Sequence, residues 1–214
     1  MDFFISDIHF GHKNVIRFCN RPFVTVSEMN NEIISRWNSV VTDADRVFVV
    51  GDVFLCSPEE AKQYISQLNG HKILVQGNHD LHEKKMLWTG FDEFHKRYEY
   101  TMPDGRLALI EHYPSPDCLL DCKYDLMIHG HIHIDDKVVG KKINVSCDIW
   151  DFYPVSIDKL CELETSDLEK EEFFKVNVDE NGVLSISCKI RMEDFSGAAA
   201  HVYKEMNRKH RSQK

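Results

Sequence analysis

Five short apolar runs of this chain are each followed directly by aspartate, asparagine, glutamate or histidine, with at most one glycine between. The runs are FFIS (3–6), VFVV (47–50), ILVQ (73–76), LALI (107–110) and DLMI (125–128). Because they are rich in large apolar residues and lack polar alternation, they are typical of strands buried on both faces. In an open α/β sheet, sites form beyond the carboxyl ends of such strands. The polar residues are therefore expected to converge in space.

The polar residues at these strand ends offer carboxylate, amide and imidazole groups. They are Asp7, His9, Asp52, Asn78, His79, Asp80, His112, His131 and His133. A set of oxygen and nitrogen donors without thiolate suits Mn, Fe or Zn. A single histidine is more often a surface or core residue, but five such strand ends are hard to explain by coincidence. The sequence therefore predicts a metal site.

Helix-like segments between the runs complete an α/β pattern. Residues 27–41 carry an apolar stripe after Ser27, which we expect to be the N-cap of a helix. Residues 57–70 open with SPEE, in which Ser57 and Glu60 have the spacing of a capping box.

Turn-forming residues predict two antiparallel pairs. The turn MPDG joins 94–101 to 106–111, and the turn DENG lies within a hairpin expected over 173–190. Residues 161–214 also carry an acidic stretch, a helix-like segment and a basic tail. We interpret them as a C-terminal appendage within the same domain as a core of residues 1–160.

Composition restricts the class of protein. The chain has 214 residues, of which 43% are hydrophobic, enough for one well-packed domain. It has no apolar run that could span a bilayer, no leader-like N-terminal segment and no CxxC pair among its seven cysteines. We therefore expect a cytoplasmic protein with reduced thiols and no membrane partner.

The net charge of −9 disfavours a general nucleic-acid-binding protein, which needs a basic face. It is compatible with a phosphorylated substrate, because bound metal ions supply local positive charge. A phosphorylated small molecule or nucleotide is therefore the expected partner, and nucleic acid is less favoured.

The order of the polar motifs resembles that of one known family. D-x-H, GD, GNHD, H and GHxH, in this order, are similar to the motifs of the calcineurin-like metallophosphoesterase superfamily. The segments at 6–23 and 144–160 resemble a small bacterial and phage subgroup of it. The resemblance covers about residues 1–160 and implies a four-layer α/β/β/α sandwich with two divalent metal ions.

Carried over by position, the resemblance implies two metal sites that share Asp52. The first site has three further ligands, Asp7, His9 and His133, and the second has Asn78, His112 and His131. Manganese is the expected metal, with iron, zinc or nickel as alternatives. The resemblance also implies that His79 acts as an acid near the leaving group and that Asp80 orients His79.

The chemistry implied is hydrolysis of a phosphate ester. A hydroxide shared by the two ions attacks phosphorus in line, and the ions neutralise the phosphoryl oxygens. Phosphodiesters or nucleotide-type substrates are slightly preferred on superfamily grounds alone. Four further residues are expected to contact the substrate: His12, Arg17, Arg21 and Tyr113. Either arginine could hold a phosphate through two parallel hydrogen bonds.

Two other classes of function stay open from the sequence. A nuclease could use the tail at 203–214, whose five basic side chains and one glutamate give a net charge of +4. Such a tail is also typical of a solvated chain end. A non-catalytic scaffold with this fold would be expected to have lost ligand residues, whereas all ligand positions are present here.

Overall fold

The computed structural model describes residues 1–115, 120, 123–133, 136–165, 174–178 and 184–188. The chain divides into two units, Met1–Ser166 and Asp167–Lys214. In the second unit, β11 (Phe174–Val178) and β12 (Leu184–Cys188) form the predicted antiparallel hairpin. The basic tail at 203–214 lies outside the described residues. That residues 161–214 belong to one domain with the core stays a prediction.

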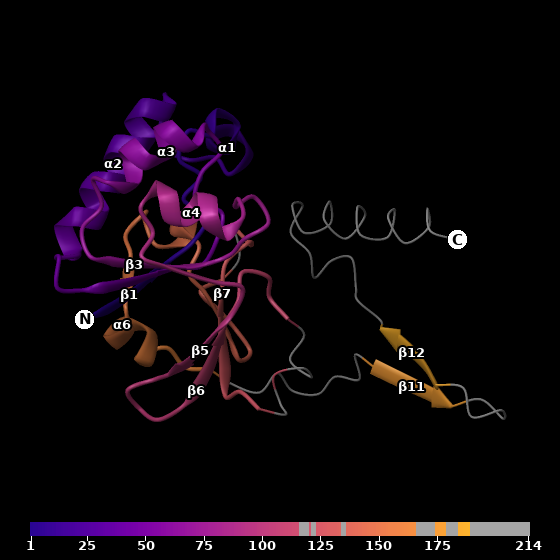
Figure 1. Ribbon diagram of the computed structural model, residues 1–214. Coiled ribbons are helices and arrows are strands. Elements are labelled where there is room, and N and C mark those ends of the chain that lie inside the picture. The colour runs from indigo at the N-terminus through magenta and orange to yellow at the C-terminus, as the bar shows by residue number, and fades with distance from the viewer. Residues whose placement is uncertain (116–119, 121–122, 134–135, 166–173, 179–183, 189–214) are drawn as a thin grey trace. The chain divides into compact units, whose positions relative to one another are not determined.

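The first sheet contains three of the apolar runs as neighbouring strands (Figure 1). Its order is β10 (Val155–Ser156), β1 (Asp2–Ile5), β2 (Arg46–Val49), β3 (His71–Val75) and β4 (Glu93–His95). β1 to β4 are parallel, and β10 pairs with β1 in the antiparallel direction. The carboxyl ends of β1, β2 and β3 therefore lie at the same edge of this sheet.

The second sheet contains the other runs. Its order is β5 (Tyr98–Thr101), β6 (Leu107–Ile110), β7 (Leu126–His129), β9 (Lys142–Asn144) and β8 (Val138–Val139). β6, β7 and β9 are parallel, and the edge strands β5 and β8 are antiparallel to their neighbours.

The prediction of one strand over 94–101 is wrong. β4 pairs with β3 in the first sheet, and only β5 pairs with β6. The chain changes sheets between them because Phe94 packs in the core beneath the helices, whereas Tyr98 packs in the core between the sheets.

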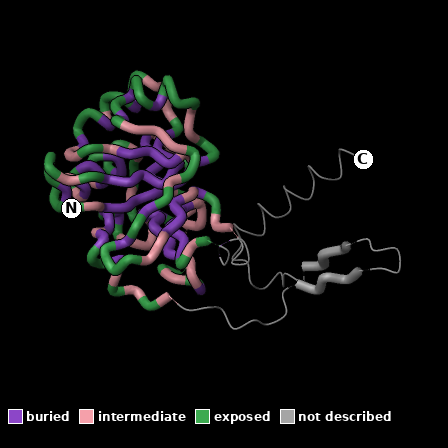
Figure 2. The backbone as a smooth tube through the Cα atoms, turned by 60° about the horizontal axis from the view of Figure 1, so that its bottom comes forward, coloured by how far each residue is buried: buried purple, intermediate pink, exposed green. Residues whose placement is uncertain are grey.

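Side chains of the central strands alternate between two cores. On β2, Val47 and Val49 face the helices, whereas Phe48 faces the second sheet. Ala108 and Ile110 of β6 pack in that same inter-sheet core. The apolar residues of β1, β2 and β3 are thus buried, with side chains in both cores, as predicted (Figure 2). The outer face of the second sheet carries a smaller cluster of Leu109, Leu120 and Met127.

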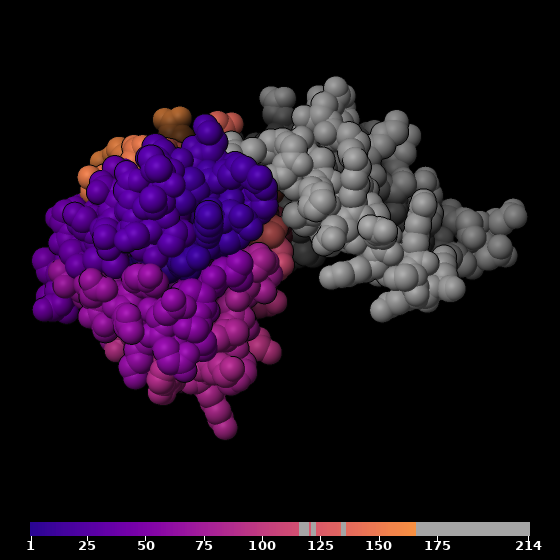
Figure 3. All heavy atoms as spheres, turned by 90° about the horizontal axis from the view of Figure 1, so that it is seen from above, coloured from indigo at the N-terminus to yellow at the C-terminus, as the bar shows by residue number. Residues whose placement is uncertain are grey.

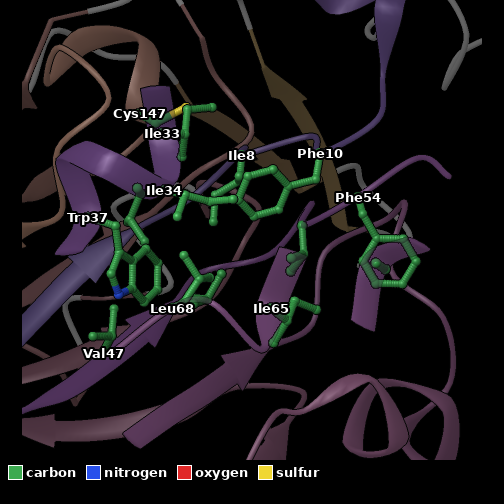
Figure 4. Packing of buried hydrophobic residues seen from close by; sticks show 14 of the residues in the cluster. Ile8, Phe10, Ile33, Ile34, Trp37, Val47, Phe54, Ile65, Leu68 and Cys147 are labelled. Atoms are coloured by element: carbon green, nitrogen blue, oxygen red, sulfur yellow. The ribbon is translucent and has the colours of Figure 1, made fainter. Parts of the chain in front are cut away.

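Helices cover the outer face of the first sheet. α2 (Val26–Val40), α3 (Pro58–Ile65) and α4 (Glu83–Thr89) contribute side chains to the core against this face. Figure 4 shows Ile34 and Trp37 of α2 directed toward Val47 and Leu68. Viewed from above, the N-terminal half of the chain forms most of the visible face of this unit (Figure 3). Two sheets flanked by helices confirm the predicted α/β sandwich.

The helix ends test the predicted caps. Ser57 and Glu60 form the predicted capping box at the start of α3. α2 instead begins at Val26, so the prediction of Ser27 as its N-cap is wrong: Thr25 accepts a hydrogen bond from the Glu28 amide at 3.1 Å. The short helices α1 (Lys13–Phe18) and α6 (Ile157–Cys161) were not predicted. Among the described residues, no helix combines the length and apolar character needed to cross a bilayer.

Candidate metal centre

Loops from both sheets bring the candidate ligands together. Three loops follow β1, β2 and β3 of the first sheet, and two follow β6 and β7 of the second. A parallel bridge between Ser6 and Ser146 joins the end of β1 to the segment after β9. The predicted convergence therefore occurs where the strand ends of two sheets meet, not at the edge of one sheet.

Six of the predicted ligands form two groups. In each group, one donor atom per residue lies within 4.8 Å of the others. The first group, called the Asp7 group, is Asp7, His9 and His133. The second, called the Asp52 group, is Asp52, His112 and His131. Asn78 adjoins the second group, because its Oδ1 lies 3.1 Å from His112 Nε2.

Asp52 belongs to the second group and also lies close to the first. Its Oδ2 is 3.8 Å from His9 Nε2 and 3.5 Å from His112 Nε2. Two ligand atoms that each lie about 2.1 Å from one ion are about 3 to 4 Å apart. The spacing fits ligands of a shared ion better than direct hydrogen bonds, which need about 3.2 Å or less. The donor set and its spacing therefore fit divalent metal ions.

The backbone is strained at four of these residues. The φ angles are +58° at Asp7, +55° at His9, +57° at Asp52 and +70° at His131. The left-handed conformation costs a non-glycine residue roughly 1–2 kcal/mol. Such strain persists only where the surroundings enforce it, and it concentrates at functional sites.

Two glycines allow the chain to approach the carboxylates closely. A Cβ on Gly77 would lie 2.3 Å from Asp52 Oδ1, and one on Gly130 would lie 2.8 Å from Asp7 Oδ2. Any larger residue would therefore displace the carboxylate or the loop that carries it.

Two histidines have their Nδ1 atoms held in hydrogen bonds. His112 Nδ1 lies 2.8 Å from the Val50 carbonyl oxygen, and His133 Nδ1 lies 2.7 Å from Asp148 Oδ2. Burial alone would lower the pKa of both rings. The nearby carboxylates of Asp52 and Asp7 nevertheless raise the pKa of His112 to about 9. Without metal, Asp7 and Asp148 raise the pKa of His133 to about 11.

His9 is held in the neutral form that a metal ligand needs. Burial lowers its pKa to about 3. Its Nδ1 is buried and has no hydrogen-bond partner among the described groups. Beside it, Asp7 accepts a hydrogen bond from Ser6 Oγ at 2.6 Å and from the His131 amide at 3.0 Å.

Asp80 supports the loop of Asp52, and its predicted role in orienting His79 stays a prediction. Asp80 Oδ2 accepts hydrogen bonds from the amides of Asp52 at 3.0 Å and Gly77 at 2.8 Å. Its Oδ1 accepts one from the Val53 amide at 2.9 Å. Both oxygens thus bond to backbone amides that hold the loops after β2 and β3 together.

Several predicted residues lie at the exposed side of the centre. The His79 side chain is 45% exposed, and its Nε2 lies 3.9 Å from Asp52 Oδ2. Tyr113 is 47% exposed and its ring lies 4.5 Å from that of His131. The His12 ring lies 5.3 Å from that of His9. All three side chains lie beside residues of the ligand groups.

The two arginines have different environments. Arg17 is exposed and its guanidinium lies over the Phe18 ring at 5.4 Å. Arg21 is buried, and its donors are used by Asp148 and by two backbone carbonyl groups. The prediction that Arg21 contacts the substrate is therefore corrected, since no donor faces the open side.

Two nearby residues were not predicted as parts of the site. Asp148 bonds to His133. Cys19 forms a further close group with His133 and Asp148. The apolar run 142–146 is also followed closely by an acid, and this pattern could have identified Asp148.

Comparisons with known proteins agree with this geometry. The family model described as "Calcineurin-like phosphoesterase" matches residues 3–135. The uncharacterized protein MJ1445 of Methanocaldococcus jannaschii is 34% identical over an alignment of 171 residues, and the alignment covers 75% of this chain and 89% of that protein. The gene 66 protein of Mycobacterium phage L5 is 27% identical over an alignment of 179 residues, and the alignment covers 69% of this chain and 86% of that protein.

A solved structure also resembles the fold. The crystal structure of a protein of unknown function, AQ665 from Aquifex aeolicus, aligns with a TM-score of 0.65 and 26% identity. The alignment covers 77% of this chain and 99% of that one. The family implies divalent metal ions and a phosphate-ester substrate, and the two ligand groups are candidates to hold such ions. The chain belongs to the calcineurin-like phosphoesterase family and is a hydrolase that acts on phosphate esters.

Proposed function

We propose that this metal-dependent phosphoesterase uses two metal ions to hydrolyse phosphodiesters or nucleotide-type phosphate esters. The position of Asp52 carries the proposal. Its Oδ2 lies 3.8 Å from His9 in one ligand group and 3.5 Å from His112 in the other. A carboxylate in this position is suited to bridge two ions.

The Asp7 group together with Asp52 would hold one ion, and the Asp52 group together with Asn78 would hold the other. Oxygen and nitrogen donors favour manganese, with iron, zinc or nickel as alternatives. When bound, the ions supply a hydroxide nucleophile at neutral pH and stabilise charge on the phosphoryl oxygens. Because Asn78 is a neutral ligand, the loaded centre keeps positive charge toward the phosphate.

His79 is proposed to protonate the departing oxygen. Its amide donates to Asp52 Oδ1 at 2.9 Å, which anchors the residue beside the centre. Its side chain is 45% exposed and therefore free to reach a substrate. General acid catalysis of this kind contributes about a hundredfold or more to the rate.

Substrate recognition is assigned to the exposed side of the centre. Tyr113 presents a half-exposed ring beside His131, and His12 lies beside His9. Arg17 presents an exposed guanidinium that can pair with a phosphate. We propose these three residues as the substrate contacts.

The proposal is tested by hydrolysis of bis-p-nitrophenyl phosphate and p-nitrophenyl phosphate. Metal-stripped full-length protein is refilled with Mn²⁺ and compared with Asp52→Asn. Asp2→Asn is the matched control, because Asp2 lies at the opposite end of β1 and pairs with Arg46.

Faster turnover of the diester that requires both Mn²⁺ and Asp52 is the expected result. A preference for the monoester would overturn the proposed substrate class. Full activity of Asp52→Asn would overturn the bridging role of this residue. Absence of activity together with absence of bound metal would favour a non-catalytic protein with this fold.

A further inference from the structure

Arg21 and Asp148 form a buried ion pair next to the Asp7 group. The Arg21 side chain is 0% exposed and that of Asp148 is 6% exposed. Nε and Nη2 of Arg21 donate to Oδ1 and Oδ2 of Asp148 at 2.7 and 2.8 Å. This forked geometry fixes both side chains relative to each other.

Arg21 also holds the segment that carries the first two ligands. Its Nη2 donates to the Asp7 carbonyl oxygen at 2.6 Å, and its Nη1 donates to the Ile8 carbonyl oxygen at 2.9 Å. Asp7 and His9 are both in the left-handed conformation. These bonds to the carbonyl groups therefore stabilise a strained backbone that aims two ligands at one point.

Asp148 extends the same network to the third ligand. Its Oδ2 accepts a hydrogen bond from His133 Nδ1 at 2.7 Å. His133 Nε2 then faces Asp7 Oδ1 at 3.6 Å. One ion pair thus bonds to Asp7, to the peptide group between Ile8 and His9, and to His133, although Arg21 and Asp148 are 127 positions apart.

We propose that Arg21 and Asp148 are positioning residues for the ion held by the Asp7 group. Arg21 sets the backbone of Asp7 and His9, and Asp148 orients His133 so that Nε2 is the donor to the metal. The inference rests on the proposed metal centre. Outer partners of this kind commonly change metal affinity by about 10–100-fold.

The second ion should not depend on this pair. His112 Nδ1 bonds to the Val50 carbonyl oxygen, and Asp80 bonds to three amides of the loops around Asp52. Neither support involves Arg21 or Asp148. Loss of the ion pair should therefore affect one ion selectively, which a merely structural role would not do.

The first test measures Mn²⁺ binding by full-length Asp148→Asn in competition with a chelator. Asp2→Asn is the control, because Asp2 forms a similar forked pair with Arg46, at 2.8 and 2.6 Å, outside the ligand groups. We expect Asp148→Asn to bind one ion about 10–100-fold more weakly and the other as wild type does. At an intermediate Mn²⁺ concentration, the electron paramagnetic resonance spectrum of wild type should be that of a coupled Mn²⁺ pair. The spectrum of Asp148→Asn should be that of a single Mn²⁺ ion.

Wild-type affinity for both ions in Asp148→Asn would overturn the inference. An equal loss of affinity for both ions would also overturn it, because that result indicates a general structural defect. Wild-type protein that binds no pair of ions would overturn the proposed function and this inference together.

A second test needs no variant and therefore does not depend on the folding of Asp148→Asn. Wild-type protein with ¹⁵N-labelled histidine is loaded with Zn²⁺, which is diamagnetic, and examined by NMR. We expect His133 to carry its proton on Nδ1, in a hydrogen bond to Asp148, and to bind metal through Nε2. Metal bound through Nδ1 would overturn the inference.

Discussion

The two ligand groups are supported in different ways. The Asp7 group depends on side chains far apart in the sequence: Arg21 and Asp148 bond to its backbone and to His133. The Asp52 group depends mostly on main-chain atoms. The Val50 carbonyl oxygen meets His112, and three amides of the Asp52 and Gly77 loops meet Asp80.

The difference follows from where the residues lie in the fold. His112 follows β6, and its Nδ1 reaches the end of β2 across the two sheets, so a strand end supplies its partner. His133 lies two residues further along its loop than His131, beyond the strand ends, and needs a side chain to reach it. Most substitutions therefore leave the backbone partner of His112 in place. A single substitution of Asp148 removes the partner of His133.

The largest expected effect comes from replacing Asp52, the ligand proposed to bind both ions, and it is compared with replacing His133, which is proposed to bind one. Asp52→Asn should lose both ions and lower kcat/KM by about a thousandfold or more, because Asp52 adjoins both groups. His133→Ala should lose one ion and keep the other. Metal content after gel filtration and turnover of bis-p-nitrophenyl phosphate measure both effects. Loss of only one ion from Asp52→Asn would contradict the comparison.

The next largest effect concerns the exposed acid. His79→Ala should keep both ions but lower kcat by about a hundredfold for an ester with a poor leaving group. The loss should be smaller for p-nitrophenyl esters, whose leaving group needs little protonation. Steady-state kinetics on both kinds of ester check this. Full activity of His79→Ala on the poor leaving group would refute the acid role.

A matched pair of glycine substitutions compares the two groups directly. In Gly77→Ala the new Cβ would lie 2.3 Å from Asp52 Oδ1, and in Gly130→Ala it would lie 2.4 Å from Ser6 Oγ, beside Asp7. Each should cost about 1–3 kcal/mol in the free energy of unfolding. Gly77→Ala, which displaces the shared Asp52, should weaken both ions. Gly130→Ala displaces Asp7 and lies next to His131, so it should weaken the ion of the Asp7 group most and the other ion less.

Urea denaturation and chelator competition measure these effects. Gly105→Ala is the control, since a Cβ there meets no atom within 4 Å but the φ of +90° still strains the backbone. It should lose stability without losing metal. Equal metal loss from Gly77→Ala and Gly130→Ala would show that the groups do not act separately.

The smallest expected effect is a difference between the two groups in how their metal affinity depends on pH. Metal must displace a proton from His112, with a pKa of about 9, and from His133, with a pKa of about 11. Affinity should therefore rise about tenfold per pH unit for each proton displaced. Above pH 9 the affinity of the Asp52 group should become constant while that of the Asp7 group still rises. Competition titrations under argon from about pH 7 to about pH 10 measure this.

The stability of the metal-free protein should fall above pH 6.5, whereas the affinity for metal rises. His112 has a pKa raised above its ordinary 6.5, so its contribution to stability is complete below pH 6.5 and is lost as the pH rises toward 9. His9 has a pKa lowered to about 3, so its contribution is lost as the pH falls below 6.5. Thermal unfolding of the metal-free protein should thus show greatest stability near pH 6.5. A stability that rises steadily to pH 9 would contradict these assignments.

Much of the site could be predicted because it depends on local rules. Apolar runs form strands, chain direction places the residues after each run at a strand end, and carboxylates beside imidazoles suit metal ions. Asp7, His9, Asp52, His112, His131 and His133 were found in this way, and they lie in two close groups. The capping box of α3 was predictable for the same reason, since its contacts span only three residues.

The sequence by itself thus determined which strands form and which polar residues follow them. Only the tertiary structure decided which of these residues are buried and to what each bonds. Arg21 and Arg17 are equally plausible phosphate ligands in the sequence, but one is enclosed by Asp148 and the other is exposed. Asp80 follows His79 directly, yet its carboxylate turns to the amide of Asp52. Hydrogen bonds between distant segments depend on how two sheets pack, and no local pattern encodes that packing.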